Sequence, residues 1–480
     1  MTMRRNQLQM MAQEHQAWLK DKSKGKRANF SRKNLTGADF SNLNFAYGIF
    51  QGANMTRANC SSALLSGGDF SHANLKKANF SQAKLVAAKF RSATLTGAAF
   101  RQANLQKVIL VSSKADGVSF MGADFRLGRI IGTDMKGCNL TKARFEHAVM
   151  EGCNLEQVRM MGVQMEGQSL EGRNMAGANF KGATLKKMNL KNVNFKKVDL
   201  SQANLEGSDF TGANLKEANF TGATLRAVKF RNVIATGAIF NKSVLDFSDL
   251  SHGDFSGASF VSCSLDRVQM GASILIKTVF DKSSLNGTLL RSAVLKGASF
   301  NQCDLTGTRL PLDQVKGKAM LGIKMEKSML KGLNLKGFVL RGSSLKGSDL
   351  TGANLKGADL SGVDLSRCHL GGTIFDKAKL YKTNFTASSM VKASFVKANA
   401  REAIFERAIL DNAVFTKARV SNANFHNASL KGANCVKANF QSTNLVGANL
   451  TKADFTKGDI TGSQYESDTL EGAVLEKTLL

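Results

Sequence analysis

The dominant feature of the sequence is an apolar residue at every fifth position from Phe30 to Leu480. This frame covers 91 positions without a slip, and no charged, amide or aliphatic hydroxyl side chain occupies any of them. Of the 31 phenylalanines, 29 fall in the frame and only Phe247 and Phe338 lie outside it. A period of five matches neither a helix nor a flat strand. The pattern therefore predicts a solenoid in which the chain turns a corner at every unit.

The residues around the frame are patterned too. The residue two before each frame position is usually small, most often alanine, and the residue one before is commonly Asn or Asp. The unit is A-(N/D)-(L/F)-x-x, as in residues 213–220. We expect the large and the small residue to point inward, while Gly, Asn, Asp and Ser accommodate the turns. Continuous backbone pairing between coils also explains why the chain contains one proline.

This repeat resembles that of the pentapeptide repeat proteins, and the resemblance covers residues 28–480. It implies an all-β solenoid, namely a right-handed quadrilateral β-helix with four pentapeptides in each coil and about 23 coils. We expect four segments along the chain. They are an N-terminal helical cap at 1–27, a first β-helix segment at 28–310, an irregular coil or bulge at 311–320, and a second β-helix segment at 321–480.

Departures from the repeat locate the weak places. Five charged residues occupy the small inward position, where an unpaired charge is costly to bury: Lys33, Arg173, Asp313, Lys318 and Asp468. Two of them fall with the only proline inside 311–320, which predicts the bulge. A second weak place is expected at 111–118, where the frame residue is only Ala115. The methionine-rich run 150–175 is interpreted as adaptable core filling.

The first 27 residues lie outside the repeat. Helical spacing relates a set of mostly apolar residues there: Leu8, Met11, His15, Trp18 and Leu19. We expect this short helix to cap the first coil, because an open coil end is an exposed strand edge. The last frame residue is Leu480, so the final coil has no such cover in the sequence. That end suggests end-to-end homodimerisation or docking onto a partner, with fraying as the alternative.

Catalytic chemistry finds no support in the sequence. The seven cysteines lack C-x-x-C spacing and the six histidines are scattered, so we expect no enzyme, no metal site and no cofactor. No apolar run is long enough for a signal peptide or a membrane-spanning helix. A cytoplasmic location is therefore expected, with non-classical secretion left open.

The basic charge is the feature that the fold does not require. The formal net charge is +29, from 66 Lys and Arg against 37 Asp and Glu. With 20 residues in each coil, the face whose frame residues are 40, 60, 80 and so on carries 22 basic and 9 acidic residues from position 31 onward. Toward the C-terminus a lysine recurs on this face in each of eleven consecutive coils, and we call this set the lysine ladder: Lys277, Lys296, Lys316, Lys336, Lys356, Lys377, Lys397, Lys417, Lys437, Lys457 and Lys477.

Stacked like charges repel, and such a strip would attract a polyanion. The hypothesis we favour is a non-enzymatic binding or assembly scaffold whose ladder docks an acidic protein surface. Alternatives are a sequence-independent nucleic-acid binder, a bacterial secreted or injected effector, and a solvated face copied along with its repeat. The resemblance also raises mimicry of DNA by family members that bind gyrase, but such mimicry needs an acidic rod, and +29 has the wrong sign.

Overall fold

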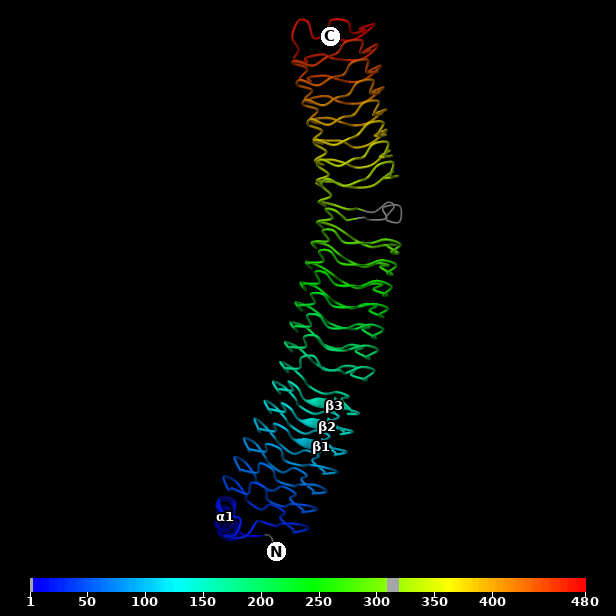
Figure 1. Cartoon of the computed structure of the whole chain (residues 1–480). Coiled ribbons are helices and arrows are strands. Elements are labelled where there is room, and N and C mark those ends of the chain that lie inside the picture. Colours follow the sequence, from blue (N-terminus) through cyan, green and yellow to red (C-terminus); the bar gives the residue numbers. More distant parts are fainter. Residues whose placement is uncertain (1–2, 309–318) are drawn as a thin grey trace. The chain divides into compact units, whose positions relative to one another are not determined.

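The computed structural model describes residues 3–308 and 319–480, and the chain forms two compact units, Met1–Asp254 and Phe255–Leu480. The regular elements are α1 (Arg5–Lys20), β1 (Ile109–Val111), β2 (Arg129–Ile131) and β3 (Val149–Glu151) (Figure 1). The three strands form one parallel sheet in the order β1-β2-β3. Elsewhere in the described residues, parallel bridges join positions 20 residues apart, such as Asn34 with Asn54 and Lys379 with Asn399. Both units are therefore β-helices with four pentapeptides in each coil.

The repeat satisfies its backbone almost completely, which explains its regularity. We number the residues of each unit 1 to 5, with the frame residue at position 5. The Phe40 N–H donates to the Asn59 carbonyl of the next coil (2.7 Å), and the Asn59 N–H donates back to the Ala38 carbonyl (2.9 Å). The Ala38 N–H closes the corner on the Leu35 carbonyl (3.0 Å). Because buried backbone groups must be paired, nearly every position needs its N–H, and proline is excluded from most of them.

Each corner is a tight turn with a left-handed residue at position 2. Gly37 has a φ of 67° and Lys377 a φ of 57°, which with the hydrogen bond from position 3 is typical of a type II turn. Lysine and other non-glycine residues thus also adopt the positive φ of the corner, a role that was expected of Gly, Asn, Asp and Ser. Asn and Asp act instead at position 4. There the Asn34 Oδ1 accepts the Thr36 N–H (3.2 Å), a donor that the backbone hydrogen bonds between coils do not use.

The frame residues form the core. Every one of them is buried across 30–305 and 320–460, whereas Tyr465 and Leu480 are exposed. Phenylalanines 20 residues apart stack face to face, as Phe220 does on Phe240 with ring centroids 4.8 Å apart. The buried methionines of 150–175, such as Met160, fill the same interior, which agrees with the interpretation as core filling.

Small polar residues at position 3 are buried by one repeated hydrogen bond. The Ser208 Oγ donates to the Leu185 carbonyl 23 residues earlier (2.7 Å), and the Cys138 Sγ does the same to Ala115 (2.9 Å). All seven cysteines are buried, and none of them forms a disulfide. Burial raises the pKa of Cys138 to about 12 and that of Cys368 to about 11, so these thiols stay protonated and unreactive.

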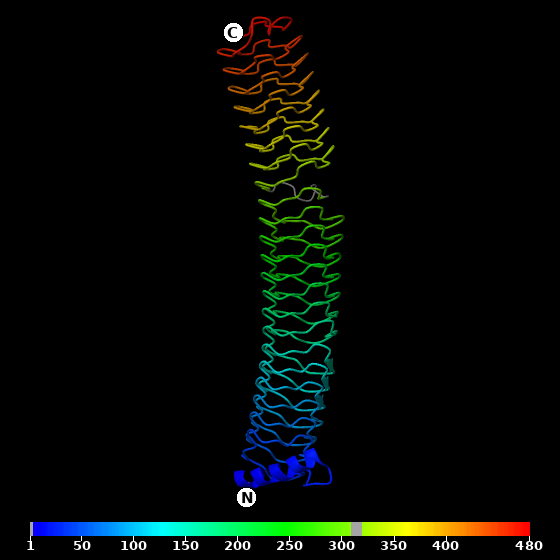
Figure 2. The same cartoon turned by 60° about the vertical axis from the view of Figure 1, so that its left-hand side comes forward.

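Helix α1 lies across the start of the first coil (Figure 2). Leu8 and His15 of this helix are buried, while its Met11, Trp18 and Leu19 are half-buried, close to the predicted apolar set. The Arg5 guanidinium donates to the Asp39 and Ser41 carbonyls, each at 2.7 Å. In later coils these two carbonyl positions accept N–H groups from the preceding coil, so α1 supplies the donors that the first coil would otherwise lack.

His15 makes this contact sensitive to pH. Its Nε2 lies 2.7 Å from the Ala46 carbonyl, and its Nδ1 accepts the Ala28 N–H (3.0 Å), so the ring must be neutral to make both bonds. Burial, opposed by the Ala46 bond and reinforced by the charges of Arg27 and Lys22, lowers the pKa of His15 below 6.5.

Acidification is therefore expected to weaken the docking of α1. His15 takes up a proton near pH 6.5 in the unfolded chain but only at lower pH in the folded one. The stabilisation of the folded state by neutral His15 is therefore complete above pH 6.5 and declines as the pH falls below it. Trp18 stacks on His15 with centroids 5.4 Å apart and is the only tryptophan, so its fluorescence reports the contact. We expect the signal to change between pH 7 and 5 in the wild type and to be flat in His15→Gln. An equal change in both proteins would contradict the role of His15.

Two predicted weak places have different outcomes. The bulge predicted at 311–320 falls almost entirely outside the described residues, while the flanking coils keep the register through the bridge between Asp304 and Lys324. The weak place predicted at 111–118 is wrong, because Ala115 is fully buried and Lys114 pairs with Asp134. An alanine at the frame position leaves the backbone hydrogen bonds between coils intact, and these bonds hold the register.

Of the five inward charges, Asp313 and Lys318 lie outside the described residues, and the other three are wholly or partly exposed and form no ion pair among the described residues. Lys33 and Asp468 are both exposed, and Arg173 is half-buried. Around Asp468 the unit 466–470 forms consecutive turns in place of a bridge, which carries the carboxylate into solvent. This agrees with the expectation that a lone charge is not buried in the core.

Candidate functional site

The described lysines of the ladder lie on one face of the unit Phe255–Leu480. Ten of its eleven lysines are described and all ten are exposed turn residues, while Lys316 lies outside the described residues. The coils under the column are joined directly, since the Lys277 N–H donates to the Lys296 carbonyl (2.9 Å). Bridges on the same face run from Ala319 to Leu479 at 20-residue steps. Neighbouring lysines therefore rise from adjacent coils about 4.8 Å apart.

The ladder lysines occupy two positions of the corner, position 1 and position 2. Seven ladder lysines sit at position 2 and themselves adopt φ values of 53–59°. The other described ones sit at position 1 and are followed by a glycine with positive φ, as Lys356 is by Gly357. A lysine with positive φ costs more conformational free energy than a glycine does. The column of lysines therefore continues through corners whose backbone would favour glycine.

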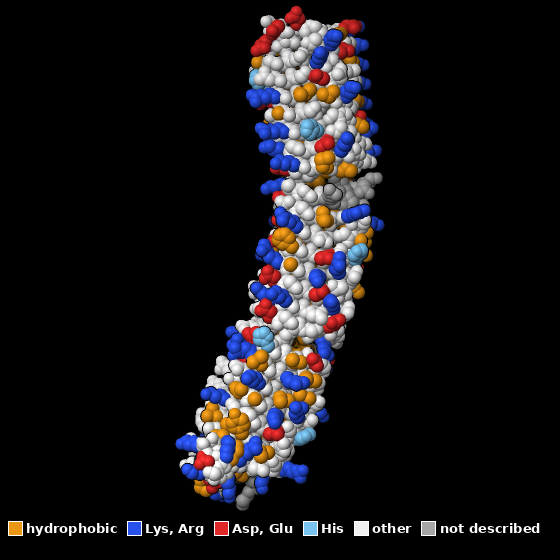
Figure 3. All heavy atoms as spheres, viewed as in Figure 1, with side chains coloured by type: hydrophobic (Ala, Val, Ile, Leu, Met, Phe, Trp, Pro, Cys, Tyr) orange, Lys and Arg blue, Asp and Glu red, His pale blue; other side chains and the backbone are white. Residues whose placement is uncertain are grey.

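The charge of this unit is concentrated on the ladder face. Among its described residues this face carries 12 Lys and Arg and 4 Asp and Glu, whereas the other three faces together carry 15 and 13. Figure 3 shows basic side chains recurring from coil to coil along the edges of the unit. The excess of positive charge therefore lies in one strip.

The ion pairs show where this face is neutralised. In the unit Met1–Asp254, Lys136 pairs with Glu156 (3.2 Å) and Lys197 with Glu217 (3.6 Å), one coil apart on this same face. In the second unit Arg341, Lys382 and Arg407 form ion pairs, whereas the ten described ladder lysines form none with described residues. On this face, ion pairs between neighbouring coils therefore occur in the first unit but not among the described residues of the second.

The few carboxylates on the strip are occupied elsewhere. Asp376 accepts hydrogen bonds from the Ser394 hydroxyl (2.5 Å) and the Val396 N–H (3.1 Å), and Asp359 faces Arg341 (3.7 Å). These two carboxylates therefore have partners other than the ladder lysines. An incoming acidic group would therefore compete with few carboxylates of the strip itself.

Two further basic residues belong to the strip and were absent from the predicted ladder. Lys379 and Arg419 are exposed at position 4 of the same face, where they bridge to Asp359 and Asn399 respectively. Their 20-residue phase could have revealed them, but the prediction considered only the two positions that open each unit. They widen the strip beyond a single column.

Other kinds of site have little to support them in the described residues. No group of three His, Cys, Asp or Glu side chains there is placed to hold a metal ion. The one helix in 3–308 and 319–480, α1, is neither long nor apolar enough to cross a membrane.

Comparisons with known proteins agree on the repeat. A family model described as "Pentapeptide repeats (8 copies)" matches most of the chain, and one described as "Pentapeptide repeat region" matches residues 163–240. The first model matches 26–59, 53–91, 88–126, 119–157, 230–267, 273–310, 328–367, 353–390, 393–432 and 433–464. No curated protein matches the chain.

Several solved structures are similar to segments of the chain. HetL, a pentapeptide repeat protein involved in heterocyst differentiation regulation in the cyanobacterium Nostoc sp. strain PCC 7120, is 21% identical, with 59% of this chain and 94% of HetL covered and a TM-score of 0.21. A pentapeptide repeat protein of the Arabidopsis thaliana thylakoid lumen is 36% identical, with coverage of 22% and 68% and a TM-score of 0.18. QnrB1, a plasmid-mediated fluoroquinolone resistance protein, is 20% identical, with coverage of 49% and 90% and a TM-score of 0.22.

Proposed function

The chain belongs to the pentapeptide repeat family, and we propose that it is a non-enzymatic scaffold that docks an acidic protein surface on its lysine ladder. Family members are generally interaction proteins rather than enzymes, and their fold is a right-handed quadrilateral β-helix. Within this proposal α1 acts as the cap that keeps the first coil from pairing with other strands.

The observation that carries the proposal is the unpaired state of the ladder. Ten lysines in register repel one another, and no described carboxylate forms an ion pair with them. A strip of this kind raises the rate of encounter with an acidic surface and fixes its register. Pairing like that of Lys136 with Glu156 would remove this property, yet among the described residues of this face it occurs only in the first unit.

An acidic protein fits the strip better than nucleic acid does. The strip is a column of lysines, which make point contacts and carry no base readout. Tyr381, the tyrosine nearest to the middle of the unit, lies on another face beside Lys382, so base-stacking aromatics do not belong to the strip. Duplex DNA therefore serves as the comparison ligand.

The test is charge reversal at four ladder positions, Lys356, Lys377, Lys397 and Lys417, each changed to Glu. We expect binding to poly-glutamate to weaken at least about tenfold through a lower association rate, and its salt dependence to flatten. The matched control changes four exposed lysines that lie on other faces and form no ion pair among the described residues: Lys327, Lys392, Lys431 and Lys452. Both variants lose the same net charge.

Surface plasmon resonance at several salt concentrations distinguishes the outcomes. Equal weakening in both variants would mean that net charge alone matters and would overturn the docking strip. Unchanged binding in the ladder variant would do the same. Tighter binding of duplex DNA than of poly-glutamate, with the same dependence on the ladder, would favour the nucleic-acid alternative.

A further inference from the structure

The stacking of coils is interrupted at one place in the unit Met1–Asp254. Directly after β3 in the chain, the coil at 146–157 and the coil at 166–177 are not bridged on two neighbouring faces. They remain joined on the other two, where the Phe145 N–H donates to the Gln164 carbonyl (2.9 Å) and the Met160 N–H to the Asn179 carbonyl (2.7 Å). The two coils therefore separate along a single side.

The separated edges carry unpaired backbone groups. One coil earlier, the Met135 N–H donates to the Asn154 carbonyl (3.0 Å) and the Gly132 N–H to the Glu151 carbonyl (2.8 Å). Their equivalents on the separated edge have no hydrogen-bond acceptor among the described residues: the N–H groups of His147, Met150, Gly152, Leu155 and Gln157. Since the Ser169 and Asn174 N–H groups opposite also lack acceptors, β3 ends its sheet as an open edge facing a second open edge.

Gln168 explains why the coils separate. It stands at position 3, and its Nε2 donates to the Phe145 carbonyl 23 residues earlier, the same bond that Ser208 makes to Leu185. The glutamine side chain is longer than that of serine, so the same bond holds the two coils farther apart. Its Oε1 is buried without a partner, and the next inward position is Arg173, which is half-buried and has no ion pair among the described residues.

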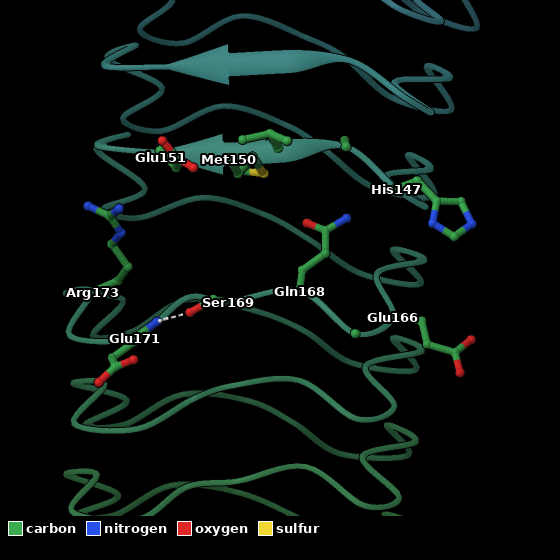
Figure 4. A pocket seen from close by; sticks show the side chains of 11 residues that line it. His147, Met150, Glu151, Glu166, Gln168, Ser169, Glu171 and Arg173 are labelled. Carbon is green, nitrogen blue, oxygen red and sulfur yellow. Dashed lines mark hydrogen bonds between the residues drawn. The ribbon is translucent and has the colours of Figure 1, made fainter.

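The result is a cleft of about 570 Å³ with charged ends. Figure 4 shows Gln168 pointing into the space between the coils, with His147 and Glu166 at one end and Arg173 at the other near Glu151. Neither Glu151 nor Glu166 forms an ion pair or side-chain hydrogen bond among the described residues, and a third lining carboxylate, Glu171, accepts a hydrogen bond from the Asn189 amide (2.9 Å). The volume far exceeds the roughly 30 Å³ of one water molecule.

We propose that this cleft binds an extended, basic peptide segment of a partner, which pairs with the edge of β3. Unpaired N–H and C=O groups that recur at strand spacing are satisfied together only by another strand, which is the chemistry of β-strand addition. The free carboxylates of Glu151 and Glu166 favour lysine or arginine side chains on that strand. This site lies in the first unit and is independent of the lysine ladder in the second.

Hydrogen exchange of the full chain tests both the cleft and its ligand. The probe is an eight-residue peptide of alternating lysine and valine, compared with a glutamate–valine peptide and with the lysine peptide N-methylated along its backbone. In the free protein we expect amides of 147–157 to exchange at least about tenfold faster than those of 127–137 one coil earlier. The lysine peptide should slow them to the rate of 127–137, and the two comparison peptides should not.

Variants separate the cleft from its charge preference. Gln168→Ala with Arg173→Ala should close the cleft, protecting 147–157 without peptide and abolishing peptide binding. Glu151→Lys with Glu166→Lys should leave the fast exchange but weaken the lysine peptide at least about tenfold. The matched control is Glu471→Lys with Glu476→Lys, two exposed glutamates of the second unit, and it should bind like the wild type.

Three results would overturn the proposal. One is protection of 147–157 in the free wild type, which would mean that the coils are paired. Another is equal binding of the N-methylated peptide, which would exclude backbone pairing. The third is equal weakening by the Glu471 and Glu476 control, which would leave only the net charge as the cause.

Discussion

Replacing Phe220 with alanine is expected to lower the free energy of unfolding of the first unit by about 4 kcal/mol. Phe220 is fully buried and stacks on Phe240 (4.8 Å), with edge contacts to Phe210 and Phe230. Alanine would leave a cavity in a column whose backbone ladder prevents collapse, because each coil is fixed to its neighbours on four sides. The cost should appear mainly in the adjacent coils, as in other repeat proteins with nearest-neighbour coupling.

The matched control is Phe247→Ala in the same unit. Phe247 lies outside the frame, at a corner with a φ of 62°, and is 55% exposed. The same truncation there should change stability by less than about 1 kcal/mol, because exposed side chains contribute little. Denaturant unfolding followed by circular dichroism compares the two, and hydrogen exchange locates the weakened coils. Equal losses in both variants would contradict the role of the frame as the source of core stability.

Replacing Gln168 and Arg173 together with alanine is expected to raise the free energy of unfolding of the first unit by about 2 kcal/mol. The double variant restores the small inward residue at two adjacent units, removes the partnerless Gln168 Oε1 and lets the coils around β3 and 166–177 pair. Each backbone bond regained contributes about 1 kcal/mol, and the entropy cost of ordering the two edges offsets some of that gain.

Thermal and denaturant unfolding of the two single variants and the double variant would measure this gain. Gln168→Ala should account for most of it, because its side chain spans the gap to the Phe145 carbonyl. The control, Gln202→Ala, changes an exposed turn glutamine and should have little effect. A loss of stability in Gln168→Ala would show that the amide holds the coils together rather than apart.

Much of the architecture follows from local rules that are visible in the sequence. The five-residue frame predicted the buried column, and the burial of every described frame residue from 30 to 460 agrees with it. The helix at Arg5–Lys20 followed from its apolar spacing. The roles of Asn34 as a turn acceptor and Lys377 as a left-handed corner residue were not predicted, because backbone hydrogen bonds decide them.

The two candidate sites were predictable from the sequence to different degrees. The 20-residue phase of the ladder was visible in the chain, and each of its described lysines is exposed. Its lack of ion pairs was not predicted, although the glutamate that Lys136 meets lies 20 residues further along the chain. The cleft was not predicted either. Arg173 stood out as an inward charge, whereas Gln168, which spans the gap, did not.

The sequence by itself determined the repeat, the buried face and the side on which basic residues gather. Each of these depends only on the period of the sequence, which is visible without any interatomic distance. Only the tertiary structure decided which charges are neutralised and where two coils separate. Those outcomes depend on side-chain length and on the partner one coil away, as Gln168 and Glu156 show. A residue 20 positions distant in sequence is a direct neighbour in the β-helix, and its contacts decide the function of the shared face.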